Sequence, residues 1–324
     1  MRAVVLGGTR FIGRALVAGL LDAGHEVMLV HRGAADPDPF PDLQHVHVLR
    51  TELDQARPQV DAFAPDVLID MIQFSRETAR SALTGLPGDF RRVVISSMDV
   101  YDAYDALHKE LVRGAMPADE SGPLRTDLYP YRGSIQGMDD YEKLDVEEEY
   151  LGVGSTVCRL PMVYGEHDYQ RREEPILRRV RAGRTRIPMG AGNWLATRGY
   201  VGDVARGIRL AAEHDDIAGE VFNLGEQRSL TAELWARAIL EAAGSSAELV
   251  RVPDEALPED LGTLAAIGQH MLVDSAKARA VLGWTEIDKM EAIGRSVRWH
   301  LAHPPETSGD DFGADDEALA RAGA

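Results

Sequence analysis

The first fourteen residues constrain the fold more than any other stretch of this sequence. An apolar run over residues 3–6 precedes a glycine-rich turn over 7–13, and apolar residues then recur at helical spacing over 14–21. That order is typical of a strand, a tight turn and a helix. Gly7 allows a sharp exit from the strand, and Gly13 lets the helix lie close to the sheet. Backbone N–H groups at such a helix start hold pyrophosphate groups, so the stretch predicts a dinucleotide site.

One position of this turn departs from the usual dinucleotide fingerprint. Arg10 stands where the middle glycine of G-x-x-G-x-x-G is expected, so a structural turn without a ligand is the alternative interpretation. The following segment favours the cofactor, because a strand-like run over 25–30 follows the helix, with Gly24 where the helix should end. The predicted cofactor contacts in the turn are Gly7, Thr9, Arg10, Phe11, Ile12 and Gly13.

Strand-like segments alternate with helical ones through the first half of the chain. They cover residues 25–30, 44–49, 66–72, 91–97 and 155–160. This alternation predicts an α/β fold, with a Rossmann-type doubly wound parallel sheet covered by helices on both faces. Ligands bind such sheets at the carboxyl ends of the strands, where we expect Met71 to contact the cofactor.

The end of the second strand is where a dinucleotide-binding domain selects its cofactor. An acidic residue there would bind the ribose 2′-hydroxyl of NAD, but the sequence reads His31-Arg32-Gly33. Arg32 can pair with a 2′-phosphate, which favours NADP over NAD. A solvated surface arginine is the alternative.

Composition limits the classes of partner. The chain has 324 residues and a formal net charge of −18, which argues against nucleic acid as the main partner. No run approaches the ~18 apolar residues that span a bilayer, so no membrane partner is predicted. Cys158 is the single cysteine and lies in an apolar run, where we expect a packed core thiol and, by default, a reducing cytoplasm. No metal site is predicted.

Several motifs together resemble the extended short-chain dehydrogenases/reductases, the NAD-dependent epimerase/dehydratase family. They are Gly7 to Gly13, Ser96-Ser-Met-Asp-Val-Tyr101, Lys143 with Glu147, Arg159-Leu-Pro-Met-Val-Tyr-Gly165, Tyr200 to Ala205, Glu220 to Gly225 and Leu282-Gly-Trp284. The resemblance implies a cofactor domain over 1–165, to which a segment near 198–225 returns, and a smaller α/β substrate domain over 166–305. It also implies a homodimer. The acidic residues 306–324 read as a solvated or disordered tail.

The resemblance also assigns roles at the crevice. Ser97 matches the residue that positions the substrate, Lys143 matches the lysine that contacts the nicotinamide ribose, and Pro161 lies where the chain passes the nicotinamide. Asp99 matches an acidic residue that abstracts a proton in the sugar-nucleotide dehydratases of the family. A structural role for Asp99 in the following turn is the alternative.

The family tyrosine is missing from its usual position. It should stand four residues before Lys143, on the same face of a helix, and Asp139 occupies that place. Asp139 would be ionised and could act as a base but hardly as an acid. Tyr141 is two residues from Lys143 and could serve only if the helix, expected over 139–150, started irregularly. The loop residues Tyr129 and Tyr131 are further candidates.

The second half carries the candidate substrate contacts. A helix expected from Glu174 has apolar residues on one face, so its arginines, Arg178 among them, should lie on the flank or outer face. They would bind an anionic diphosphate or, alternatively, form a solvated basic helix. Asn193, Trp194 and Arg198 lie in a Gly-rich loop where family members contact substrate.

These observations predict an NAD(P)-dependent epimerase, dehydratase or reductase. It would move hydride between nicotinamide and a carbinol carbon of a polar small molecule, such as a sugar nucleotide. One alternative is a catalytically silent dinucleotide-binding sensor, which Asp139 makes credible. The other is an RNA-associated protein, because the Gly7–Gly13 motif resembles that of chloroplast stem-loop-binding relatives; the net charge weighs against it.

Overall fold

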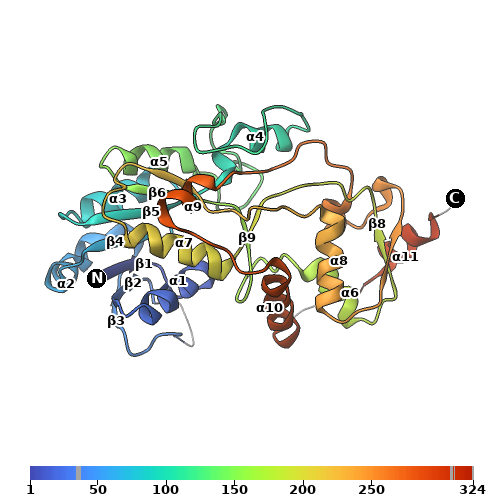
Figure 1. Ribbon diagram of the computed structural model, residues 1–324, viewed down its shortest axis with the longest axis horizontal. Coiled ribbons are helices and arrows are strands. Elements are labelled where there is room, and N and C mark those ends of the chain that lie inside the picture. The colour runs from blue at the N-terminus through green and yellow to red at the C-terminus, as the bar shows by residue number, and fades with distance from the viewer. Residues whose placement is uncertain (34–37, 307–308, 310, 323–324) are drawn as a thin grey trace.

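The computed structural model describes residues 1–33, 38–306, 309 and 311–322, which form two lobes (Figure 1). The centre of the larger lobe is a parallel sheet. Its strands are β1 (Arg2–Leu6), β2 (Glu26–His31), β3 (Gln44–His47), β4 (Val67–Asp70), β5 (Arg91–Ser97), β6 (Thr156–Leu160) and β10 (Val221–Asn223). They lie in the order β3-β2-β1-β4-β5-β6-β10, and each pair is parallel. The predicted α/β fold with a Rossmann-type sheet is confirmed.

Helices cover both faces of this sheet. On one face α1 (Phe11–Asp22) packs against α7 (Val201–Glu213), and on the other lie α2 (Arg57–Phe63), α3 (Arg76–Gly85) and α5 (Lys143–Leu151). Between strands and helices run the short 3₁₀ segments η1 (Arg50–Ala56) and η2 (Met98–Val100), the latter leading into α4 (Asp102–His108). A strand buried on both faces needs apolar residues throughout, which is why β1 reads Ala-Val-Val-Leu after its first residue.

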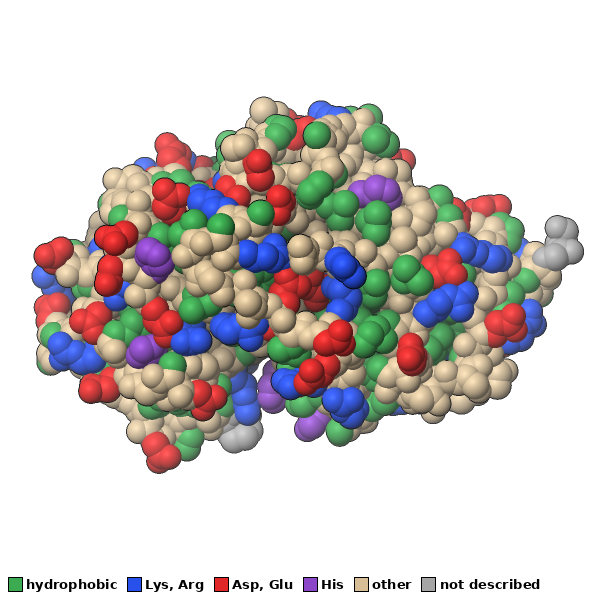
Figure 2. Space-filling view, viewed as in Figure 1, with side chains coloured by type: hydrophobic (Ala, Val, Ile, Leu, Met, Phe, Trp, Pro, Cys, Tyr) green, Lys and Arg blue, Asp and Glu red, His purple; other side chains and the backbone are tan. Residues whose placement is uncertain are grey.

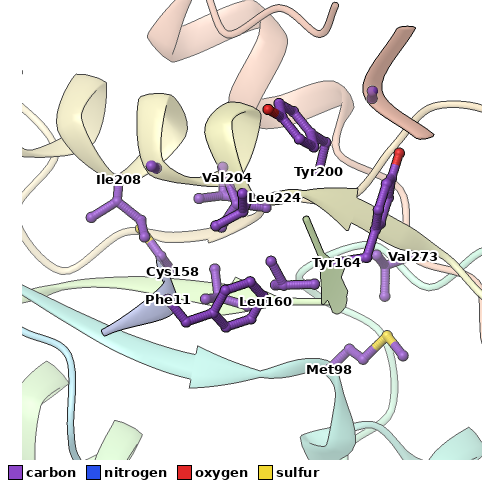
Figure 3. Close-up of a cluster of buried hydrophobic side chains, with 14 of the residues drawn as sticks. Phe11, Met98, Cys158, Leu160, Tyr164, Tyr200, Val204, Ile208, Leu224 and Val273 are labelled. Atoms are coloured by element: carbon purple, nitrogen blue, oxygen red, sulfur yellow. The ribbon is translucent and has the colours of Figure 1, made fainter. Parts of the chain in front are cut away.

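The core between β6 and α7 contains the single cysteine (Figure 3). Cys158 and Leu160 of β6 lie beneath Val204 and Ile208 of α7, with Phe11 beside them (Figure 3). Burial raises the pKa of the Cys158 thiol to about 12. The thiol is therefore a small apolar filler, as predicted from its strand-like surroundings.

The smaller lobe is built around three packed helices. These are α6 (Glu174–Arg181), α8 (Ala232–Ala242) and α10 (Lys289–Ala302), and α8 contacts both of the others (Figure 1). A short parallel pair, β8 (Arg186–Met189) with β11 (Glu248–Arg251), lies against them, together with η3 (Asp254–Ala256) and η4 (Glu259–Leu264). None of the helices in the described ranges is long and apolar enough to cross a bilayer.

The chain passes between the lobes more than once. After β6 it forms β7 (Met162–Tyr164), which pairs with β9 (Arg198–Tyr200) once the chain has returned from α6 and β8. Residues 198–225, which we expected to return to the cofactor domain, supply β9, α7 and β10. A later segment, α9 (Ala276–Leu282), also packs against α7 and β10, so part of the expected substrate domain lies on the larger lobe.

The acidic tail differs from its predicted solvated state. Residues 313–320 form α11 (Gly313–Ala320), and the Asp315 side chain is fully buried. Both carboxylate oxygens of Asp315 accept hydrogen bonds from the Arg179 guanidinium, each at 2.7 Å. This bidentate pair replaces the hydrogen bonds that the Asp315 carboxylate would otherwise make to water, so the carboxylate can be buried. Residues 307–308, 310 and 323–324 of the tail lie outside the described residues.

Candidate active site

The glycine-rich turn after β1 has the backbone shape that a pyrophosphate site needs. Gly7 and Gly8 have φ values of 97° and 99°, which side chains rarely tolerate. A Cβ on Gly13 would stand 2.8 Å from the Gly8 Cα, so only glycine lets the start of α1 approach the turn this closely. The first turn of α1 contains no acidic side chain that would repel a phosphate. These residues therefore fit a dinucleotide, whose nicotinamide would accept or supply hydride.

The other predicted cofactor residues lie at several places around the same edge of the sheet. Met71 directly follows β4 and lies beside Gly7, since a Cβ on that glycine would be 3.3 Å from the Met71 Cβ. Arg32 follows β2 and its side chain is exposed. Pro161 links β6 to β7 and packs near Gly199 of β9.

Four predicted side chains meet at the end of β5. The Tyr141 hydroxyl donates a 2.7 Å hydrogen bond to Oδ2 of Asp99. The Asp99 backbone N–H donates to the Ser97 hydroxyl. Lys143 Nζ donates to the backbone oxygens of Gln73 and, at 3.0 Å, Ile95. The structure thus brings together a tyrosine, a carboxyl group, a lysine and a serine at the strand end.

Burial sets the protonation of this cluster. It raises the pKa of the Asp99 carboxyl, although Tyr141, Arg125 and Lys143 act in the opposite direction. Burial, together with the Asp99 charge, raises the pKa of Tyr141 well above its usual range. Burial also lowers the pKa of Lys143 to about 8 against the pull of Asp99. Oδ1 of Asp99 is buried and has no hydrogen-bond partner among the described residues, so it can accept a proton.

The helix that carries Lys143 begins later than predicted. We expected it over 139–150, but α5 starts at Lys143, with Glu142 as its N-cap. Glu142 is fixed there because Arg125 donates to both of its carboxylate oxygens, and neither side chain of this pair is exposed. Tyr141 therefore precedes the helix, and its side chain reaches the face where Lys143 and Asp99 lie.

Asp139 lies apart from this cluster. Its side chain is exposed, and its Oδ1 accepts a 2.8 Å hydrogen bond from the Gly133 backbone. Tyr131 lies closer, because its ring centroid is 5.0 Å from that of Tyr141 and its hydroxyl bonds to Tyr104. Tyr129 donates its backbone N–H to Glu142 and thus supports the helix start.

A cavity of about 1000 Å³ lies in the smaller lobe, between α6, α8 and η4. Trp194, Trp235 and Arg198 line it, and Met162 at its edge belongs to β7, next to Pro161. Three predicted substrate residues, Arg178, Trp194 and Arg198, therefore line the cavity. The cavity does not include the side chains of the cluster at the end of β5, which lies in the other lobe. Asn193 does not line it, because its amide bonds to the Ile267 backbone.

Arg198 is the cation best placed to bind an anion in this cavity. It is buried in β9, stacks on the Trp235 ring at 4.4 Å, and has no carboxylate within salt-bridge distance among the described residues. Burial lowers its pKa to about 10, although Glu226 acts in the opposite direction. Arg172, also on the cavity wall, donates to the Val163 carbonyl and lies 3.9 Å from Asp168. Trp235 did not stand out in the sequence, whereas Arg172 belongs to a visible arginine-rich stretch over residues 171–186.

Four of the arginines on and after α6 are paired with carboxylates of this chain. Arg178 pairs with Asp260, Arg181 with Glu174, and Arg184 with Asp316. Arg179 is fully buried between Asp260 and Asp315, which corrects our expectation that every arginine of this helix lies outside. The reason is that α11 and η4 cover this face of the helix. On the face shown in Figure 2, basic side chains likewise lie next to acidic ones rather than forming a continuous basic surface.

The fold and the strand-end cluster define an extended short-chain dehydrogenase/reductase, a Rossmann-type enzyme class. A family model described as the NAD dependent epimerase/dehydratase family matches residues 3–84 and 88–225. The chain belongs to this family, as its motifs predicted.

Three proteins that are similar to this chain differ in their described activities. The chloroplast stem-loop binding protein of 41 kDa b of Arabidopsis thaliana is 26% identical over 99% of this chain and 84% of its own length. A 4-hydroxy-2-methyl-3-oxo-4-farnesyl-3,4-dihydroquinoline-1-oxide ketoreductase of Stigmatella aurantiaca is 23% identical over 87% of this chain and 84% of its own. The structure of UDP-glucose 4-epimerase from Bifidobacterium longum, with NAD+ and UDP, matches with a TM-score of 0.70 at 17% identity, covering 94% of this chain and 99% of that one. The last likeness shows the fold alone.

Proposed function

We propose that this protein is an NADP-dependent oxidoreductase or epimerase that acts on a carbinol carbon of an anionic polar metabolite, such as a sugar nucleotide. The observation that carries the proposal is the 2.7 Å hydrogen bond from Tyr141 to Asp99 beside Lys143 and Ser97. It supplies a proton acceptor at the strand end where the family binds its reacting carbon.

The cluster provides a two-step path for one proton. A bound nicotinamide would supply the hydride acceptor for oxidation of the carbinol carbon. The substrate hydroxyl would then give its proton to the Tyr141 oxygen, and Tyr141 would give its own proton to Asp99. The reverse order delivers a proton to the carbonyl oxygen during reduction. Lys143 places a positive charge near the tyrosine oxygen while it is deprotonated, and Ser97 positions the substrate oxygen.

The substrate's anionic group would lie in the cavity of the smaller lobe. Arg198 and Arg172 supply positive charge there, and Trp194 and Trp235 supply apolar walls suited to a flat ring. The UDP held by the Bifidobacterium longum epimerase is a ligand of this chemistry.

The direct test is a nicotinamide absorbance assay with purified protein and a panel of sugar nucleotides, using NADPH and NADH in parallel. We expect turnover with at least one anionic substrate and tighter binding of NADP than NAD. Arg32→Ala should weaken NADP by about tenfold, a typical loss for a charge-assisted contact, and leave NAD nearly unchanged. Equal losses for both cofactors would contradict phosphate recognition by Arg32. Tight dinucleotide binding without turnover on any substrate would favour the silent sensor.

An RNA-binding role has one supporting observation, the name of the Arabidopsis relative. The arginines of α6 that would contact phosphates are engaged by carboxylates of this chain, and the net charge is −18. A phosphate backbone would have to displace those internal partners. The enzyme role is therefore the better-supported proposal.

A further inference from the structure

Three histidines gather at one corner of the central sheet, outside the candidate active site. His45 and His47 are two residues apart on the edge strand β3, so their side chains point to the same face. His31 of the neighbouring β2 is directly opposite His47 in the parallel register. One imidazole nitrogen from each residue lies within 4.8 Å of those from the other two. Strand pairing thus brings together His31 and two histidines that are separated from it by at least 13 residues in the sequence.

The spacing of these nitrogens suits a metal ion. His31 Nε2 and His45 Nδ1 are 2.8 Å apart, and the three candidate ligand nitrogens all lie within 4.8 Å of one another. Nitrogens bound tetrahedrally to zinc at ~2.0–2.1 Å stand about 3.3 Å from one another, a value between those limits. Small rotations of the rings would therefore bring all three nitrogens to bonding distance.

The surroundings orient the ligand nitrogens and add a carboxylate. His45 directs its Nε2 to the Phe40 carbonyl at 2.8 Å, which leaves Nδ1 facing the cluster; metal-bound histidines usually have such a carbonyl partner. Asp38 Oδ2 lies 3.4 Å from His45 Nδ1.

We propose that His31, His45 and His47, with Asp38 as the fourth ligand, form a binding site for a divalent transition-metal ion, with zinc as its occupant. Imidazole and carboxylate donors in fourfold coordination are typical of zinc. In the metal-free form a single proton bridges His31 and His45, and the ion takes its place. His31 then carries its proton on Nδ1 and gives up the 3.2 Å bond from the Gly33 N–H. The bound ion joins β2, the edge strand β3 and Asp38.

The site is tested on the full chain after removal of any histidine tag. Zn²⁺ alone is titrated in competition with a chromophoric chelator, and Co²⁺ is added separately to read the coordination from its visible absorption. We expect one Zn²⁺ per chain and the intense Co²⁺ bands of a four-coordinate site. Zn²⁺ should also raise the Tm of the protein, because it binds only the folded chain tightly.

His47→Ala is the decisive variant, because His47 is exposed and its loss should leave the fold intact. We expect it to weaken Zn²⁺ by at least about 100-fold, the upper range for loss of a supporting residue, and to abolish the Tm increase. Asp38→Asn should weaken binding less. His214→Ala, at a histidine outside the cluster, is the matched control and should bind Zn²⁺ like the wild type. Stoichiometric binding that survives in His47→Ala, or no saturable binding by the wild type at micromolar Zn²⁺, would overturn the proposal.

Discussion

Tyr141 reaches Asp99 at the end of β5 because two other residues fix the start of α5. Arg125 and Glu142 form a buried pair, and Glu142 caps α5 so that the helix starts after Tyr141 rather than before it. With the helix extended to position 139, the spacing of two residues would have pointed Tyr141 away from Lys143. By fixing the start of α5, the pair therefore places the Tyr141 side chain near Lys143 although the two residues lack the usual spacing of four.

The proton path predicts distinct effects for its two members. Tyr141→Phe removes the group that contacts the substrate oxygen and should lower kcat by about 10²–10⁴-fold with a smaller change in KM. Asp99→Asn should lower kcat and also remove an acidic limb from the pH profile. In the wild type, kcat should fall as the pH drops through the pKa of Asp99, because the protonated carboxyl can no longer act as a base. Burial raises this pKa, so the fall should occur at a higher pH than for an exposed aspartate.

The measurement is kcat against pH for the wild type and both variants, with the exposed Asp140→Asn as control. If Asp139→Asn abolishes activity while Tyr141→Phe does not, the carboxylate at position 139 is the base after all. Full activity in both Tyr141→Phe and Asp99→Asn would remove this cluster from the mechanism.

At the scale of elements, a buried glutamic acid side chain links α6 to α10. Glu173, at the N-cap of α6, accepts a 2.5 Å hydrogen bond from Ser296 of α10, and its other oxygen lies 3.6 Å from His300. Burial raises the pKa of Glu173 to about 7, and burial together with Arg171 lowers the pKa of His300 to about 4. The pair is therefore neutral near pH 5–6, a proton on the acid and none on the imidazole.

This neutral pair makes stability depend on pH in a defined window. A folded-state pKa of about 7 against an ordinary 4.5 means that the folded protein holds the Glu173 proton more tightly. Its contribution to the free energy of unfolding is complete below pH 4.5 and is lost as the pH rises to 7. Glu173→Gln should therefore match the wild type near pH 4.5 and be more stable above pH 7, by roughly 1–3 kcal/mol.

Urea unfolding at a series of pH values gives this difference, and Glu174→Gln, at a partly exposed neighbour, is the matched control. His300 has the opposite dependence, since its contribution to stability is lost as the pH falls from 6.5 towards 4. Because the wild type and both variants contain His300, its contribution largely cancels when their stabilities are compared. A constant difference between Glu173→Gln and the wild type across the range would show that Glu173 has an ordinary pKa.

These elements also show which parts of the structure could be predicted from the sequence. The sheet, the glycine turn and Ser97, Asp99 and Lys143 were predictable because each depends on local periodicity or a short motif. The start of α5 and the folded tail were not, because each depends on an ion pair between distant residues, Arg125 with Glu142 and Arg179 with Asp315. Such pairs leave no periodic signal, and an acidic segment reads as solvated until its buried partner is known.

At the scale of the whole molecule, the larger lobe includes residues that come after the chain has first passed through the smaller lobe. β10 lies at one end of the sheet beside β6, and α7 covers α1. A chain ending at residue 165, where the first segment of the expected cofactor domain ends, would lack both. β6 would then expose its backbone N–H and C=O groups as an edge, and Phe11, Leu16 and Val17 would lose part of their cover.

We therefore expect a fragment of residues 1–165 to aggregate, and a fragment of residues 1–225 to be more soluble because it restores β10 and α7. Size-exclusion chromatography and circular dichroism of both fragments provide the measurement. A monomeric 1–165 fragment with cooperative unfolding would show that the first six strands of the sheet and their helices form a self-sufficient domain.

The repeated crossing of the chain also constrains how such a protein can acquire a new substrate. The wall of the cavity includes separate stretches near 162–178, 194–198, 232–239 and 258–264, and between the second and third of these the chain returns to build the cofactor lobe. No single contiguous exchange with a relative could transplant the whole cavity without also replacing α7 and β10. Specificity in this architecture is therefore more readily altered by substitutions at scattered wall positions than by recombination of a substrate-binding module.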